Sequence, residues 1–133
     1  GSILVPADLK GVMALIKTLK KGGCIGMLPD QVPDASGGVF APFYGKPALT
    51  MSLINKLITR TDCTAIMVHA QRVDGGFKMV FAKPEEGIYS ADPQLSASAL
   101  NASIESCIGH CIEQYQWEYK RFRKQPEGAA KVY

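Results

Sequence analysis

The first residues that could do chemistry are Asp30 and Gln31, which directly follow an apolar run at residues 24–28. Glycines and Pro29 bound the run, and its length and composition predict a strand buried on both faces. In open α/β sheets ligands bind at the carboxyl ends of the strands, so a carboxylate and an amide at this point could contact a polar substrate. The same residues also fit an ordinary connection from a strand to a helix, with Asp30 as a turn residue.

Aromatic residues and a glycine close the Gly- and Pro-rich loop that follows. In chain order they are Phe40, Phe43, Tyr44 and Gly45. Aromatic side chains at this point suggest a wall beside a site, rather than a mobile surface loop.

Four cations near the C-terminus are interleaved with aromatic residues. The cations are Lys120, Arg121, Arg123 and Lys124, and the aromatic residues are Tyr115, Trp117, Tyr119 and Phe122. Such a cluster suits an anionic membrane surface or the phosphates of a ligand. It fits equally well a segment whose aromatic side chains are buried and whose charges face water. A basic module that binds nucleic acid is a further alternative, although no RNA- or DNA-binding motif accompanies the cluster.

The four cysteines lie in apolar runs and show no Cys-x-x-Cys spacing. They are Cys24, Cys63, Cys107 and Cys111. We interpret them as reduced, buried thiols of a protein that faces the cytoplasm, in preference to disulfides or a zinc site. Cys107 and Cys111 flank His110, but they lie on one apolar helical face, which indicates core packing. We therefore expect no metal site.

Periodicity predicts the elements that position these residues. Helical spacing of apolar residues predicts helices at 9–20, from Pro47 or Thr50 to about residue 60, and at 95–113. Apolar runs at 24–28 and 63–69 predict two strands, which a right-handed strand–helix–strand crossover would make parallel. Asp74-Gly75 predicts a tight turn, after which residues 77–81 return antiparallel.

The resulting order, α-β-α-β-β-α, predicts an α/β fold in which helices pack on a small mixed sheet. Such a sheet is small for a self-contained domain, and its exposed edges favour association, so we expect a homo-oligomer. The length of 133 residues allows one domain. Gly1-Ser2 resembles a cleavage scar left by protein expression, residues 3–126 form part of a domain, and residues 127–133 form a tail. The abrupt start suggests a fragment of a longer protein.

Three blocks of sequence occur in the order seen in a known family. They are Leu19-Lys-Lys-Gly22 leading to Leu28-Pro-Asp-Gln31; Val39-Phe-Ala-Pro-Phe-Tyr-Gly45 followed by Thr50; and Ile104-Glu105 leading to Glu113-Gln-Tyr-Gln-Trp117 and Lys120-Arg-Phe-Arg-Lys124. Together they cover nearly the whole chain. They resemble the C-terminal half of the bacterial lipid A late acyltransferases, which are lauroyl and myristoyl transferases of the lysophospholipid acyltransferase superfamily. Ile112 stands where the family usually has proline, which we expect to change only a helix end.

The resemblance implies a partial lysophospholipid-acyltransferase-like fold and a role in lipopolysaccharide biosynthesis. A fatty acyl chain would be transferred from acyl carrier protein to a hydroxyl of a lipid A precursor, at the cytoplasmic face of the inner membrane. Acyl carrier protein, or coenzyme A, would carry the acyl group as co-substrate, and no other cofactor is expected. The partners would be acyl carrier protein, the lipid A precursor and the membrane surface, with no nucleic acid. A homologue that acts on a glycerophospholipid acceptor is an alternative.

In this family, a histidine and an acidic residue spaced His-x4-Asp/Glu carry out the reaction. The histidine is the general base for the acceptor hydroxyl, the acid orients its ring, and the alkoxide attacks the thioester. We expect this pair upstream, so that the present chain has no catalytic residue and is inactive alone. His69 and Asp74 match the spacing, but five steps along a strand span about 16 Å and place the side chains on opposite faces.

The resemblance also assigns binding roles. A carboxylate and an amide stand where the superfamily has its acceptor-binding loop, an aromatic residue and a glycine would shape the wall, and two arginines would contact phosphate. These residues are, in that order, Asp30, Gln31, Phe43, Gly45, Arg72 and Arg121. Gln114, Tyr115 and Trp117 also match the family, and we expect them to be structural, with Trp117 anchoring the last segment in the core.

Overall fold

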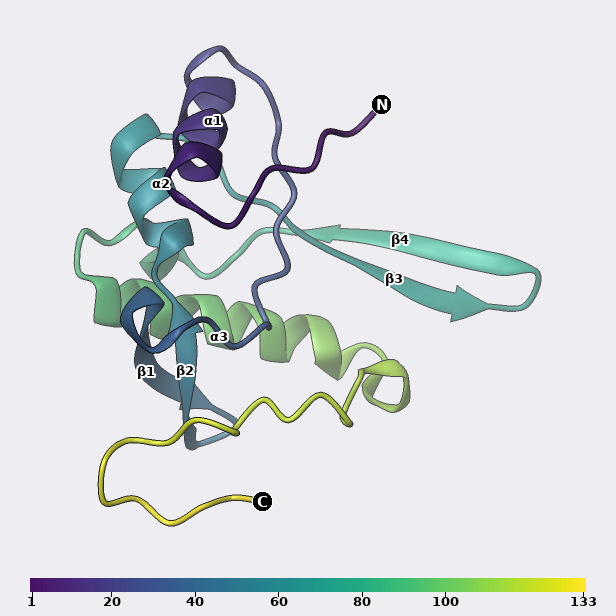
Figure 1. Cartoon of the computed structure of the whole chain (residues 1–133). Coiled ribbons are helices and arrows are strands. Elements are labelled where there is room, and N and C mark those ends of the chain that lie inside the picture. The colour runs from purple at the N-terminus through teal and green to yellow at the C-terminus, as the bar shows by residue number, and fades with distance from the viewer.

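The first helix, α1, spans Leu9–Lys20 in the computed structural model, which describes residues 1–133 (Figure 1). Asp8 caps the helix, because its carboxylate accepts a hydrogen bond of 2.9 Å from the Gly11 amide. This negative charge at the N-terminus and the lysines of the last turn both complement the helix dipole. The predicted helix at residues 9–20 is therefore confirmed.

The strands β1 (Gly38–Phe43) and β2 (Lys46–Met51) form an antiparallel hairpin that the periodicity did not predict. Tyr44 and Gly45 make its turn, with positive φ angles of 48° and 73°. Such two-residue turns match the twist of the strands, and Gly45 has no side chain to oppose its φ. The residues expected to close a loop therefore lie on a strand and in a hairpin turn.

The helices α2 (Leu53–Thr61) and α3 (Pro93–Gly109) confirm the other two predicted helices, with shifted ends. Pro47 and Thr50, expected at the start of the second helix, belong to β2 instead. Asp92 caps α3 by accepting a hydrogen bond of 2.8 Å from the Gln94 amide, and Pro93 stands in its first turn, where a missing amide hydrogen has no cost.

The strands β3 (Met67–Val73) and β4 (Gly76–Ala82) form the second antiparallel hairpin. Its turn is at Asp74-Gly75, as predicted, and Gly75 has a φ of 80°. This hairpin projects away from the helices, whereas the first hairpin lies against α3 (Figure 1).

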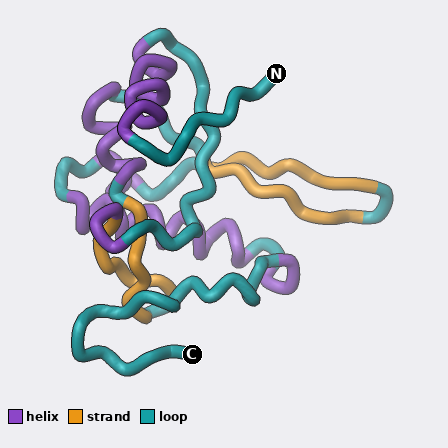
Figure 2. Tube along the Cα trace, in the orientation of Figure 1, coloured by secondary structure: helices purple, strands orange, loops and turns teal.

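The strand predicted at residues 24–28 is not formed. Residues 24–33 make no backbone–backbone hydrogen bond, and Figure 2 shows the stretch between α1 and β1 as loop except for a single short turn. The parallel pair with residues 63–69 is absent too, because β3 starts at Met67 and pairs only with β4. An apolar run becomes a strand only when another strand lies beside it to complete its hydrogen bonds, and here none does.

The core lies between α3, the first hairpin and α2. Its buried residues are Phe43, Ala48, Ile58, Ile88, Leu100, Ile104 and Ile108. The fold is thus α/β, as predicted, but with two small antiparallel sheets in place of one mixed sheet. None of the helices combines the length and the apolar character needed to span a membrane.

Candidate substrate-binding site

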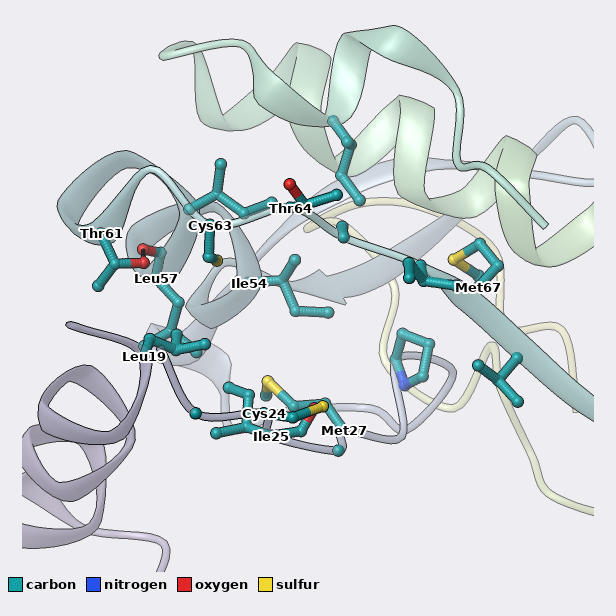
Figure 3. A pocket seen from close by; sticks show the side chains of 18 of the residues that line it. Leu19, Cys24, Ile25, Met27, Ile54, Leu57, Thr61, Cys63, Thr64 and Met67 are labelled. Atoms are coloured by element: carbon teal, nitrogen blue, oxygen red, sulfur yellow. Dashed lines mark hydrogen bonds between the residues drawn. The ribbon is translucent and has the colours of Figure 1, made fainter. Parts of the chain in front are cut away.

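A cavity of about 690 Å³ separates the two runs that were predicted to be paired strands. Residues 22–27 and Pro29 line one side, and residues 61–68 line the other. In Figure 3, Ile25 and Met27 lie across the cavity from Thr64 and Met67, with Ile54 of α2 between them. The cavity therefore occupies the space that the missing strand pairing would have closed.

The lining of this large cavity is mostly hydrophobic. Its ionisable residues are Cys24, Asp62 and Cys63, and the hydroxyl of Thr61 already donates a 2.7 Å hydrogen bond to the Leu57 carbonyl oxygen. The volume falls within the range of roughly 300–1,000 Å³ that is usual for small-molecule sites. The cavity is suited to binding an apolar chain and lacks a pair of groups for acid–base chemistry.

A smaller cavity of about 250 Å³ adjoins the large one, with Met27, Pro29, Met67 and Val68 common to both. Polar and sulfur-containing side chains enter its lining. They are Asp30, His69, Cys107, Cys111, Gln114 and Tyr115. Together the two cavities offer an apolar compartment beside a more polar one.

Asp30 and Tyr115 are coupled in the small cavity. Burial raises the pKa of Tyr115 well above its usual value, and the nearby Asp30 carboxylate raises this pKa further, while Arg121 opposes the change. The phenol therefore keeps its proton, which it donates in a hydrogen bond to the Asp30 side chain. A fixed carboxylate beside a protonated phenol can bind the hydroxyl groups of a polar ligand.

His69 has no carboxylate partner. Its ring stacks on His110 with 5.5 Å between ring centroids, and its Nε2 atom lies 3.2 Å from the Gln71 Nε2 atom. Burial lowers the pKa of His69, and the neighbouring His110 lowers this pKa further. Asp74, in the turn at the far end of β3, has no part in this environment, as expected of a chance match to His-x4-Asp.

The sequence pattern of the family described as "Bacterial lipid A biosynthesis acyltransferase" matches residues 4–124. This chain belongs to that family. The match confirms the resemblance inferred from the three sequence blocks, and it spans all the elements described above.

Curated acyltransferases of the family are similar over most of this chain. The lipid A biosynthesis lauroyltransferase of Escherichia coli K12 is 30% identical over 99% of this chain, which corresponds to 43% of that protein. The palmitoleoyltransferase of the same organism is 28% identical over 95% of the chain and 41% of its own length. A lipid A biosynthesis acyltransferase of Haemophilus influenzae is 29% identical over 92% of the chain and 38% of its length. The chain thus spans about two fifths of the relatives that it matches.

In this member of the family, the residues with predicted binding roles do not form one cluster. Asp30 lines the small cavity, and the neighbouring Gln31 is exposed. Phe43 is buried in the core, and Gly45 lies at the tip of the first hairpin. Neither lines the two cavities. Arg72 lies near the tip of the second hairpin, where its side chain is exposed.

Arg121 is buried, with 3% of its surface exposed. Its guanidinium donates hydrogen bonds to the Leu49 carbonyl oxygen at 2.7 Å and to the Thr50 hydroxyl at 3.0 Å, and it lies over the Phe43 ring. The structure thus directs these N–H groups to the protein interior. The Arg121 Nε atom is buried there without a hydrogen-bond partner.

The other C-terminal cations also contact the protein. Lys124 donates a 2.8 Å hydrogen bond to the Pro33 carbonyl oxygen, and Arg123 packs over the Tyr119 ring. Trp117, expected to anchor this segment in the core, is half exposed and donates to the Ile112 carbonyl oxygen. Part of the cluster therefore attaches the last segment to the domain, while Lys120 and Arg123 are exposed.

The residues that line the large cavity were missed as a binding site. The apolar runs at 24–28 and 63–69 carried the signal, but their composition is equally typical of buried strands. Apolar side chains indicate burial, and they do not tell whether a neighbouring strand or a ligand covers them.

Proposed function

We propose that this chain is part of an enzyme that transfers a fatty acyl chain from acyl carrier protein to a hydroxyl of a lipid A precursor in lipopolysaccharide biosynthesis. Family membership supports the acyl transfer, and the names of the relatives, a lauroyltransferase and a palmitoleoyltransferase, support a long acyl group. The observation that carries the assignment to this region is the apolar cavity of about 690 Å³.

In this proposal the acyl chain occupies the large cavity. Each buried methylene group contributes about 0.8 kcal/mol, so a long saturated chain gains affinity along its whole length. The adjoining small cavity would receive the polar acceptor, with the Asp30 carboxylate accepting a hydrogen bond from a sugar hydroxyl. The Tyr115 phenol, which donates a hydrogen bond to this carboxylate, would hold it in place.

The general base of the reaction is proposed to lie outside these residues. His69 stacks on His110 without a carboxylate partner, so it lacks the acid that would orient its ring. The remaining length of the relatives leaves room for a histidine–carboxylate pair. The whole enzyme would work at the cytoplasmic face of the inner membrane as a peripheral protein, with acyl carrier protein or coenzyme A as the acyl carrier.

Titration of the chain with laurate tests the cavity assignment. We expect calorimetry to show saturable binding of laurate and at least tenfold weaker binding by the variant Ile25→Trp, because an indole would fill the cavity from the loop side. Ile112→Trp is the matched control, since Ile112 is exposed and lies outside the cavity. Undetectable binding by the parent chain, or equal binding by the parent chain and Ile25→Trp, would refute the assignment.

A further inference from the structure

The loop that carries Asp30 has no backbone partner in the fold. Residues 24–33 make no backbone–backbone hydrogen bond, although Val32, two residues after Asp30, is buried. Burying a backbone amide or carbonyl group without a hydrogen bond is unfavourable, so side chains must complete the pairing of this loop. The residues that do so decide how firmly the Asp30 carboxylate is held beside the small cavity.

Side chains of the C-terminal segment, residues 115–124, supply these hydrogen bonds. The Tyr119 hydroxyl accepts one of 2.8 Å from the Val32 amide, which lies 87 positions away in the sequence. Lys124 donates one of 2.8 Å to the carbonyl oxygen of Pro33. The guanidinium carbon of Arg123 lies 5.1 Å from the centroid of the Tyr119 ring, and this contact helps to fix the ring. The loop and the C-terminal segment are thus joined at two consecutive residues of the loop.

The same segment holds the Asp30 side chain. The Tyr115 phenol donates a hydrogen bond to the Asp30 carboxylate, and the charge of Arg121 is close enough for this carboxylate to act to raise the Arg121 pKa. Arg121 is anchored in the core by its 2.7 Å hydrogen bond to the Leu49 carbonyl oxygen. The position of Asp30 relative to the core therefore depends on the C-terminal segment, because no strand carries it.

Tyr119 differs from Tyr115 in that it lines neither of the two cavities. It is half-buried and contacts the loop through a backbone amide. Its hydroxyl can therefore influence a ligand in the small cavity only through the position of the loop. Polar groups of a binding site must be held within about 0.5 Å of the productive geometry, and a hydrogen bond so close to Asp30 supplies such a restraint.

We propose that Tyr119 is a positioning residue for the acceptor site. Its hydroxyl fixes the Val32 amide, and the loop then holds the Asp30 carboxylate at the small cavity. The restraint on the loop rests on these contacts alone, whereas its consequence for the acceptor rests on the proposed function.

The variant Tyr119→Phe tests the restraint without any ligand, because it removes the hydroxyl and keeps the ring. We expect the NMR order parameters of the Asp30 and Gln31 amides to fall from about 0.85, the value of a rigid backbone, toward about 0.6. Hydrogen exchange at the Val32 amide should become roughly tenfold faster, since its acceptor is lost. Lys124→Met, which removes the adjoining contact, should loosen the same amides.

Tyr89→Phe is the matched control. The Tyr89 hydroxyl likewise accepts a hydrogen bond from a backbone amide, that of Ala65 at 3.1 Å, on the far side of the large cavity from the loop. This variant should leave the order parameters at Asp30 and Gln31 unchanged. Urea denaturation of each variant verifies that it is folded and measures its loss of stability.

Titration with glucosamine 1-phosphate, followed by the shift of the Gln31 amide, tests the consequence for the acceptor. We expect Tyr119→Phe to bind this sugar phosphate roughly fivefold more weakly than the parent chain, and Tyr89→Phe to bind it equally well. In the background of Asp30→Asn, Tyr119→Phe should cause no further loss, because the carboxylate that it positions is absent. A merely structural role would weaken binding by the same factor in both backgrounds.

The outcomes separate this inference from the proposed function. Unchanged order parameters in Tyr119→Phe, the same loosening of the loop in Tyr89→Phe, or equal losses of binding in the two backgrounds would overturn the positioning role. A loop that loosens as expected, in a chain that does not bind the sugar phosphate, would instead refute the acceptor site of the proposed function.

Discussion

Arg121 carries its charge in the interior, where the groups that accept hydrogen bonds from its guanidinium are neutral. The Thr50 hydroxyl lies at the centre of the network, because it accepts from Arg121 and from the Asn101 side-chain amide at 2.8 Å. Asn101 in turn donates to the Pro42 carbonyl oxygen at 2.9 Å. Burial lowers the pKa of Arg121, while Tyr115 and Asp30 act to raise it. These contacts join the C-terminal segment to α3 and the first hairpin.

The variant Arg121→Met should lower the free energy of unfolding by about 2–3 kcal/mol, because it leaves the Leu49 carbonyl oxygen and the Thr50–Asn101 pair without their charged donor. Urea denaturation measures this loss. Arg123→Met is the matched control, since Arg123 is exposed, and it should cost less than about 1 kcal/mol. Equal losses for the two variants would show that the buried network does not stabilise the fold.

At the scale of elements, the second hairpin is held by the Gln114 side chain, which forms hydrogen bonds with the backbone of β3. The Gln114 amide forms both a donor and an acceptor hydrogen bond with the backbone of Arg72, in the way that a neighbouring strand would. A two-stranded hairpin by itself is at best marginally stable in water. Contacts with α3 and the segment after it therefore decide how firmly the hairpin is held.

The variant Gln114→Ala should increase amide hydrogen exchange at Arg72 roughly tenfold, because two hydrogen bonds near the hairpin tip are lost. Amides in α3 should keep their protection. Hydrogen exchange followed by NMR distinguishes the two regions. Gln116→Ala is the control, since this glutamine is also exposed and is a near neighbour in the chain. Unchanged exchange at Arg72 in Gln114→Ala would mean that the stacked histidines alone hold the hairpin.

At the scale of the whole molecule, the chain combines an apolar cavity of about 690 Å³ with an adjoining, more polar cavity of about 250 Å³. These are binding features, and neither histidine has the carboxylate partner that a general base of this kind requires. A general base contributes about 10²–10⁴-fold to a reaction rate. The chain by itself is therefore expected to bind without catalysing.

The 133-residue chain should show no acyl transfer from lauroyl-acyl carrier protein to a lipid A precursor above the uncatalysed rate, although it binds laurate. Mass spectrometry of the lipid product measures the transfer. The variant His69→Ala serves as the control, and it should behave like the parent chain. Robust turnover that His69→Ala abolishes would show that His69 is the catalytic base after all.

The sequence by itself determined the family, the α/β class, the three helices and the turn of the second hairpin. These features are encoded locally: Asp8 stands next to the helix that it caps, and the Asp74-Gly75 pair specifies a tight turn wherever it occurs. Asp30 was predicted to stand at the carboxyl end of a buried strand, but no strand forms there, so its place beside the small cavity was not determined by the sequence.

Only the tertiary structure decided what lies beside each segment. The run at residues 24–28 has the composition of a strand, but it lines a cavity because no strand lies beside it to complete its hydrogen bonds. The basic cluster around Arg121 suggests a surface cation, but Arg121 is buried. Its burial is possible because Thr50 and Leu49, about 70 residues away in the chain, supply hydrogen-bond acceptors for its guanidinium. Composition and spacing predict local structure, whereas burial and pairing depend on partners that only folding brings together.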